Sequence, residues 1–258
     1  MLFVIDVGNT NIVAGFYEGD KLKSSYRMAT DKNKSSDEIG LFFSQLLNHE
    51  GISKEEIRDV IISSVVPSIM HALENAIKKY VGISPIVVNG SLDLGLNICY
   101  DDPKEVGADR IVNAVAVDKI YGGPAVIIDF GTATTFCVID GCSNYLGGVI
   151  YPGLKISMDA LVEKTSKLPR IEIIRPENVV GKNTVCSMQS GLVFGYAGMV
   201  DAIVSRIKKE TGTPEMLVIA TGGLSTLIAK ESETIQTIDK NLTIKGLKII
   251  YDRIKLSK

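Results

Sequence analysis

The sequence is poor in the residues from which most metal sites and catalytic triads are built. Its 258 residues include two histidines (His49 and His71), no tryptophan and four cysteines, none of which form a C-x-x-C pair. A Ser-His-Asp triad and a zinc site of cysteine and histidine ligands are therefore disfavoured. Scattered cysteines are typical of free thiols in a reducing cytoplasm. We expect the chemistry to depend on carboxylates, hydroxyls and backbone amides.

An excess of positive charge is also missing. Lys plus Arg number 28 and Asp plus Glu number 30, which gives a net charge of −2. This balance disfavours non-specific nucleic-acid binding. No stretch approaches the ~18 consecutive apolar residues of a membrane span, and residues 1–6 lack the basic region of a signal peptide. We therefore expect a cytoplasmic protein with no nucleic-acid or membrane partner.

Strand and helix patterns alternate along the chain, which is typical of the α/β class. Short apolar runs predict strands at residues 2–7, 11–17, 22–28, 60–66, 86–88, 125–128, 135–139, 147–152 and 216–221. Amphipathic stretches predict helices at residues 36–48, 67–80, 111–120, 154–163, 187–210 and 245–254. Gly195 and Gly198 each cost the long helix about 1 kcal/mol relative to alanine. We expect another helix or another chain to pack closely against them.

The two halves of the chain resemble each other. The segment 4–10 (VIDVGNT) aligns with 127–133 (IIDFGTA), at an offset of 129 − 6 = 123 residues. Each copy is followed by a second predicted strand and then by an acidic turn that contains glycine. The repeat predicts two similar lobes, with a boundary in or beside a helix near residues 115–120.

An aspartate at a strand end, followed by a glycine turn and a small polar residue, suits a phosphate and a cation. Glycine lets the backbone approach a phosphate, and successive amides of a turn form an anion site. The carboxylate can hold Mg²⁺, which prefers a few carboxylates together with phosphate oxygens. A single Asp-x-Gly is better explained as an ordinary hairpin turn. Two copies at half-chain spacing favour the phosphate interpretation.

Four segments together resemble those of type III pantothenate kinases, a family of the acetate and sugar kinase/Hsp70/actin superfamily. They are Asp6–Asn11 (DVGNTN), Gly107–Arg110 (GADR), Asp129–Thr135 (DFGTATT) and Thr221–Gly223 (TGG). The resemblance covers essentially the whole chain in order and spacing. It implies two actin-like (ribonuclease H-like) lobes, each a mixed sheet flanked by helices, which we expect at residues 1–117 and 118–258.

The same resemblance implies ATP-dependent phosphorylation of the primary hydroxyl of pantothenate, the first step of coenzyme A biosynthesis. It implies a homodimer, Mg²⁺ and a monovalent cation, K⁺ or NH₄⁺, held by Asp129. The base would be Asp109, and Gly222–Gly223 would lie in the adenosine region. ATP would bind to Asp6, Val7, Gly8, Asn9, Thr10, Asn11, Ile12, Val13 and Thr132. Pantothenate would bind to Tyr100, Gly107, Ala108, Asp109, Arg110 and Thr184, and to the partner chain.

Phosphoryl transfer is compatible with these residues, because it depends more on positioning and charge neutralisation than on a strong base. Taken on the residues alone, the segment 107–110 is also compatible with a helix start that carries an ion pair, and Tyr100 with a packing residue. The segment 180–184 (VGKNT) resembles the end of a P-loop. It lacks the first glycine, since Pro176 stands there, and the Ser or Thr after the lysine, so a P-loop is disfavoured.

Two other functions are compatible with the fold. One is a kinase or phosphatase of the same superfamily with another small substrate, from which residues 107–110 would distinguish this chain. The other is a catalytically silent regulatory protein. The presence of Asp6, Asp109 and Asp129 favours an enzyme.

Overall fold

The computed structural model describes residues 1–89 and 92–256. It divides into two compact units. Unit 1 comprises residues 1–96, 101–119 and 243–258, and unit 2 comprises residues 97–100 and 120–242. Unit 1 therefore includes the C-terminal segment that begins at residue 243. The expected division at residues 117/118 places this segment in the second lobe. The lobes 1–117 and 118–258 remain a prediction about domains.

Unit 1 is built on a five-stranded mixed sheet in the order β3-β2-β1-β4-β5. β1 pairs antiparallel with β2 and parallel with β4. The strands are β1 (Leu2–Val7), β2 (Asn11–Glu18), β3 (Lys21–Ala29), β4 (Asp59–Ser64) and β5 (Ile86–Val87). The helices are α1 (Ser36–Glu50), α2 (Pro67–Tyr80), α3 (Ala108–Ile120) and α7 (Leu242–Leu256), with short 3₁₀ turns at Lys54–Glu56 and Pro103–Glu105.

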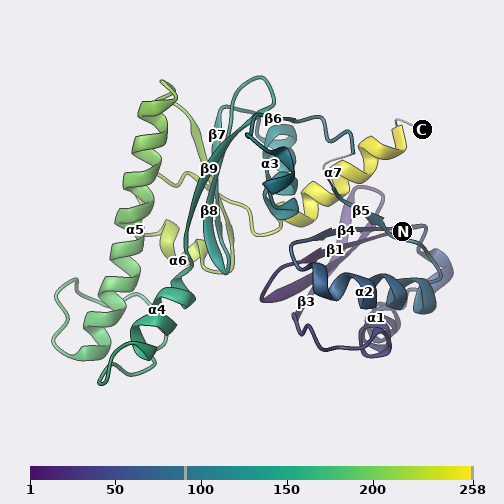
Figure 1. Ribbon diagram of the computed structural model, residues 1–258, viewed down its shortest axis with the longest axis horizontal. Helices are drawn as coiled ribbons and strands as arrows, with labels where there is room; N and C mark the ends of the chain where they lie inside the picture. Colours follow the sequence, from purple (N-terminus) through teal and green to yellow (C-terminus); the bar gives the residue numbers. More distant parts are fainter. Residues whose placement is uncertain (90–91, 257–258) are drawn as a thin grey trace. The chain divides into compact units, whose positions relative to one another are not determined.

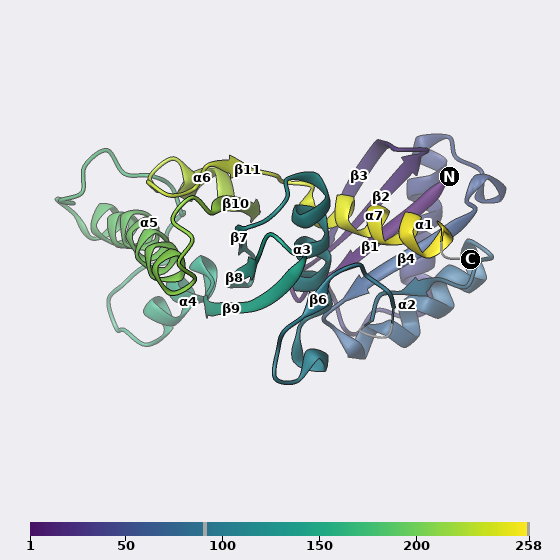
Figure 2. The same cartoon turned by 90° about the horizontal axis from the view of Figure 1, so that it is seen from above.

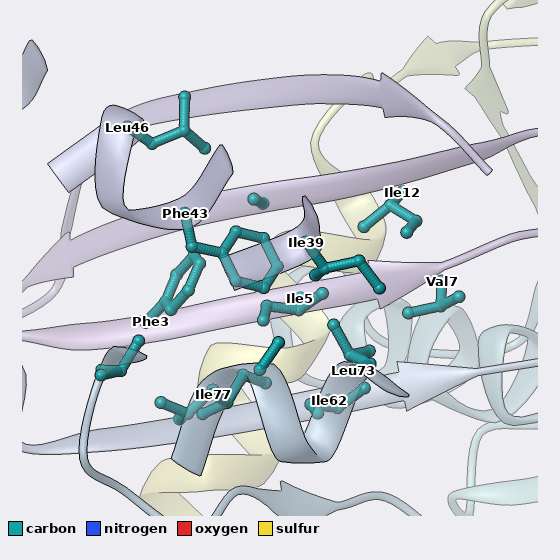
Figure 3. Packing of buried hydrophobic residues seen from close by; sticks show 14 of the residues in the cluster. Phe3, Ile5, Val7, Ile12, Ile39, Phe43, Leu46, Ile62, Leu73 and Ile77 are labelled. Atoms are coloured by element: carbon teal, nitrogen blue, oxygen red, sulfur yellow. The ribbon is translucent and has the colours of Figure 1, made fainter. Parts of the chain in front are cut away.

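Helices α1 and α2 cover one face of this sheet (Figure 1). Alternate residues of β1 point to this face, and Figure 3 shows Phe3, Ile5 and Val7 directed toward Ile39 and Phe43 of α1. Asp6 belongs to the other set of alternate residues and therefore points to the opposite face.

The ends of α1 and α2 follow from local sequence. Ser35 caps α1 in a capping box with Glu38, and Gly51 ends it in the left-handed conformation. Pro67 stands in the first turn of α2, where its missing N–H is not needed. These signals explain why both helices begin where the sequence predicts.

Helices α3 and α7 are joined by a close contact in unit 1, and Figure 2 shows α7 running along the sheet. A Cβ atom on Gly246 would lie 2.3 Å from the carbonyl oxygen of Val112. The hydroxyl of Thr243 donates to Oδ1 of Asn113 at 2.8 Å. Gly15 of β2 lies against Ile244, which places α7 on the face that carries Asp6.

Unit 2 is built on a six-stranded mixed sheet in the order β11-β10-β7-β8-β9-β6. Helices α4, α5 and α6 contribute to the apolar core on one face of it (Figure 1). The strands are β6 (Asn97–Ile98), β7 (Ala125–Phe130), β8 (Ala133–Ile139), β9 (Asn144–Pro152), β10 (Leu217–Gly222) and β11 (Thr237–Ile238). The helices are α4 (Leu154–Glu163), α5 (Thr184–Glu210) and α6 (Ser225–Ala229).

The sheets confirm the internal repeat. The order β9-β8-β7-β10-β11 in unit 2 corresponds strand by strand to β3-β2-β1-β4-β5 in unit 1. The central hairpins differ in one respect. Val7 pairs with Ile12, which leaves four residues in the first turn, whereas Phe130 pairs with Thr134, which leaves three in the second.

Within the chain, helix α5 has no close neighbour at the glycines where another helix or another chain is expected. Nothing lies within 4 Å of the position of a Cβ atom on Gly195 or Gly198, and the same is true of Gly191. No described helix of the chain therefore packs closely against these glycines. By length and composition α5 is apolar enough to cross a membrane. Its other face, including Val193, Val200 and Val204, packs in the core of unit 2, as a core helix of a globular domain does.

Candidate active site

The first glycine turn closes tightly after Asp6 in unit 1. The amide of Gly8 donates to the carbonyl of Asn11 at 2.9 Å, across the ends of the turn. Asn9 and Thr10 at its tip are exposed. Exposed successive amides of a turn suit an anion such as a nucleotide phosphate. The half-buried Asp6 lies in register with Ser63 of β4, on the face away from α1 and α2.

The segment 107–110 forms the start of α3. The amide of Arg110 donates to Oδ1 of Asp109 at 2.7 Å, so this carboxylate folds back over the helix start. A Cβ atom on Gly107 would lie 2.6 Å from the same oxygen, so a side chain at position 107 would require this carboxylate to move. Burial raises the pKa of Asp109 above its ordinary value of 3.8, although the amide and the charge of Arg110 act in the opposite direction. Arg110 is 7 % exposed.

Val65 connects the first turn with the start of α3. Its amide donates to the carbonyl of Val7 at 3.0 Å. Its Cγ1 atom lies 3.5 Å from the position of a Cβ atom on Gly107. The structure therefore brings the predicted ATP-binding turn and the predicted pantothenate segment to the same edge of the unit 1 sheet.

The second turn places oxygen atoms around Gly222 in unit 2. A Cβ atom on Gly222 would lie 2.6 Å from Oδ1 of Asp129 and 2.7 Å from the carbonyl oxygen of Phe130. A carboxylate and a carbonyl oxygen thus face the same small space, and hard cations take oxygen ligands of this kind. The sequence does not reveal this neighbourhood, because Gly222 and Asp129 are 93 residues apart and meet through the parallel pairing of β10 with β7.

Thr132 is exposed at the tip of the second turn. Gly153, the residue that precedes α4, packs against the backbone of this turn. A Cβ atom on Gly153 would lie 2.1 Å from the carbonyl oxygen of Thr132. The preceding residue, Pro152, accepts a hydrogen bond from the hydroxyl of Tyr196 on α5. Sequence reasoning missed Gly153 and Tyr196, because the contact of Gly153 with Thr132 and that of Tyr196 with Pro152 are long-range.

Tyr100 and Thr184 lie at other places in unit 2. Tyr100 packs near Gly147, which pairs with Val138, about 17 Å along β8 from the glycine turn. Thr184 begins α5 and lines a cavity of about 880 Å³ between α4, α5 and the preceding loop. Neighbours in its wall include Lys182, Asn183 and Tyr196. Within unit 2 the structure does not bring Tyr100 to the turn that holds Asp129 and Thr132.

The described residues contain no group of three or more His, Cys, Asp or Glu side chains that could hold a metal ion. None of the four cysteines, all of which lie in the described residues, forms a disulfide; Cys137 is buried and Cys142 is exposed. A metal at this site would therefore be held by few protein carboxylates. Such a coordination sphere is typical of Mg²⁺, which keeps several waters and shares ligands with substrate phosphates.

A duplicated sheet with an aspartate and a glycine turn in each copy has the actin-like fold, and known structures share it. A Campylobacter jejuni protein assigned to the Baf family is 18% identical, with a TM-score of 0.61 over 98% of this chain and 99% of that chain. Component A of (R)-2-hydroxyglutaryl-CoA dehydratase from Acidaminococcus fermentans is 12% identical, with a TM-score of 0.59 over 100% of both chains. The inorganic polyphosphate/ATP-glucomannokinase from an Arthrobacter strain is 14% identical, with a TM-score of 0.51 over 100% and 99%.

At these identities the structural likeness shows the fold alone, and that fold is actin-like. The sequence shows the family. The family model of type III pantothenate kinases matches residues 2–206, and the chain belongs to that family. It is a phosphotransferase that phosphorylates pantothenate with ATP in coenzyme A biosynthesis, and the family implies a divalent metal ion.

Proposed function

We propose that Asp109 is the base of this pantothenate kinase. It takes the proton of the primary hydroxyl of pantothenate while the oxygen of this hydroxyl accepts the γ-phosphoryl group of ATP and ADP leaves. The observation that carries the proposal is the position of Asp109 at the start of α3, joined through Val65 to the first glycine turn. Burial raises its pKa, which makes the carboxylate a better proton acceptor than an exposed aspartate.

The nucleotide would be bound by the two turns. The amides of Asn9 and Thr10 in the segment 6–13 (Asp6, Val7, Gly8, Asn9, Thr10, Asn11, Ile12 and Val13) would bind phosphate oxygens. Thr132 would contact ATP from the second turn, and Gly222–Gly223 would lie in the adenosine region. Phosphoryl transfer passes through a loose transition state, so orientation and charge neutralisation supply most of the catalysis.

Two cations fit the residues that would hold them. Mg²⁺ would be held near Asp6, which is half-buried near the end of β1, just before the first turn, and it would neutralise charge on the phosphates. A monovalent cation, K⁺ or NH₄⁺, would be held by Asp129. The second fit is supported by the carboxylate and carbonyl oxygens that converge on the space beside Gly222.

Turnover tests the proposed reaction and the monovalent site together. ADP release is expected only when ATP, Mg²⁺ and pantothenate are all present, and it should be several-fold faster with K⁺ than with Na⁺. The physical reason is that an oxygen cage of fixed size selects among cations of one charge by radius. Equal rates with Na⁺ and K⁺ would show that Asp129 does not hold a selective monovalent cation. Absence of pantothenate-dependent turnover would show that the proposed reaction is wrong.

Pantothenate would be bound by Gly107, Ala108, Asp109 and Arg110, with Arg110 on its carboxylate. The planar guanidinium can bind a carboxylate through two parallel hydrogen bonds, which an ammonium group cannot reproduce. Tyr100 and Thr184 would supply further contacts with the substrate.

The variant Arg110→Lys is expected to raise KM for pantothenate about tenfold and to leave KM for ATP unchanged. Steady-state kinetics with each substrate varied separately measure both constants. Arg27→Lys, at an exposed position of β3 in the same unit, is the matched control and should behave as wild type. An unchanged KM for pantothenate in Arg110→Lys would assign Arg110 a structural role.

We further propose a cytoplasmic homodimer. The open face of α5 at Gly191, Gly195 and Gly198 supports it, because small residues let another chain approach a helix closely. Val179 and Val180, which are 65 % and 81 % exposed, extend the apolar surface near the start of this helix. The partner chain would then supply part of the pantothenate pocket. Light scattering on the purified chain distinguishes a dimer from a monomer.

A further inference from the structure

Thr30 makes two hydrogen bonds to the first glycine turn. It follows β3 directly, and it lies 30 − 11 = 19 residues after Asn11, the last residue of the turn. Its hydroxyl donates to the carbonyl of Gly8 at 2.6 Å. Its amide donates to the carbonyl of Thr10 at 2.9 Å. One residue therefore holds two of the carbonyls in a turn of four residues.

These two bonds fix the direction of the neighbouring amides. A trans peptide unit is planar, so its N–H points away from its C=O. Because the carbonyl of Gly8 is directed at Thr30, the amide of Asn9 points away from Thr30. The same holds for the carbonyl of Thr10 and the amide of Asn11. The amide of Gly8 is occupied by the carbonyl of Asn11 across the turn.

From this arrangement we infer that Thr30 is a positioning residue for the nucleotide: it orients the Gly8–Asn9 peptide unit of the first turn so that the amide of Asn9 is preorganised for a phosphate oxygen. The inference rests on the proposed role of the turn in ATP binding. Preorganised amides bind an anion without the cost of ordering the turn at the moment of binding. Thr30 itself does not need to touch ATP.

A merely structural role for Thr30 makes a different prediction. A side-chain bond that only holds β3 to the turn would lower the stability of unit 1 and leave the binding constants of the folded enzyme unchanged. A bond that orients amides changes nucleotide binding in the folded enzyme. KM for ATP, compared with KM for pantothenate and with Tm, therefore separates the two roles.

The test uses the full-length chain with Thr30→Val, which removes the hydroxyl and keeps the shape, and Thr30→Ser, which keeps the hydroxyl. Thr30→Ala replaces the valine variant if that variant does not fold. Thr211→Val is the matched control, since the hydroxyl of Thr211 donates to the carbonyl of Ile207 at 2.9 Å far along α5. Kinetic constants are measured for both substrates, and the Kd of a non-hydrolysable ATP analogue with Mg²⁺ is measured by calorimetry without pantothenate.

We expect Thr30→Val to raise KM for ATP and the analogue Kd about three- to tenfold, the loss that one hydrogen bond supports, with an unchanged KM for pantothenate. Thr30→Ser should remain within twofold of wild type, and Thr211→Val should not differ from it. Wild-type nucleotide binding in Thr30→Val, or an equal loss in Thr30→Ser or Thr211→Val, would overturn the inference.

A further variant, Asp6→Asn, separates this inference from the proposed function of the turn. If Asp6→Asn impairs the use of ATP and Thr30→Val does not, the turn binds the nucleotide and the role of Thr30 is refuted. If Asp6→Asn leaves ATP kinetics unchanged, the proposed nucleotide site itself is wrong, and the inference about Thr30 is refuted with it.

Discussion

Asp109→Asn is expected to lower kcat by at least about tenfold, and up to the roughly 10²–10⁴-fold that a general base contributes, with little change in KM for ATP. The asparagine amide has nearly the same shape as the carboxylate and can still accept the Arg110 amide, but it cannot take the substrate proton. Asp118→Asn, which alters a second carboxylate of α3 near the other end of the helix, should turn over at close to the wild-type rate.

The pH dependence of this variant is a second readout. Because burial raises the pKa of Asp109, the wild-type rate should fall with decreasing pH at a higher pH than an exposed aspartate would give. This acidic decline should be missing from Asp109→Asn. Near-wild-type turnover in the variant, or an unchanged acidic decline, would remove Asp109 from the mechanism.

The raised pKa of Asp109 also determines whether ionisation of this carboxylate stabilises or destabilises the fold. Between the pKa of the unfolded chain and the higher pKa of the folded chain, the folded state binds more protons. Stability is therefore lost as pH rises through this window, and at neutral pH the ionised carboxylate destabilises the fold. Asp109→Asn should unfold at an equal or higher Tm at pH 7, so its low activity cannot be attributed to unfolding.

Gly222→Ala is expected to destabilise the protein by about 2–5 kcal/mol and to weaken activation by K⁺. Gly222 has φ +90°, a region that costs an L-residue about 1–2 kcal/mol. The new methyl group would also collide with Oδ1 of Asp129 and with the carbonyl oxygen of Phe130. Overpacking of this kind costs roughly 1–3 kcal/mol more, and relief requires the carboxylate to move.

Gly212→Ala is the matched control for this experiment. Gly212 also has a positive φ, +66°, but nothing lies within 4 Å of the position of its Cβ atom. It should lose only about 1 kcal/mol and keep its response to K⁺. Denaturant unfolding and potassium titrations of turnover compare the two variants. Equal stability and equal potassium activation in both would show that the space beside Gly222 is not a cation site.

The sequence predicts the local elements well because their signals are local. The strand of residues 2–7 and the helices of residues 67–80 and 154–163 occur with the predicted bounds. Helix α5 begins at Thr184, three residues before the predicted start, because Asn183 caps it by accepting the amide of Cys186 at 2.8 Å. This cap was visible in the sequence as an asparagine before a helical stretch.

Features that depend on contacts between distant residues were not predictable in the same way. The strands β6 and β11 have two residues each and carry no periodic pattern. The assignment of residues 243–258 to unit 1 depends on packing against α3 and β2. Asp6 and Asp129 were found through their repeat, and Asp109 through the resemblance of residues 107–110 to the family. Thr30 and Gly153 act through long-range contacts that no spacing in the sequence predicts.

The unequal turns bear on how the two halves of such a gene can diverge. If the halves descend from one duplicated segment, a single residue was gained or lost in the turn, between the last strand pairs Val7–Ile12 and Phe130–Thr134. The alignment offset then changes from 129 − 6 = 123 before the turn to 134 − 12 = 122 after it, while both hairpins keep their pairing. A change of one codon at this position alters the glycine turn of one half and leaves its sheet intact. Loop length is thus the variable through which duplicated halves can acquire separate ligands.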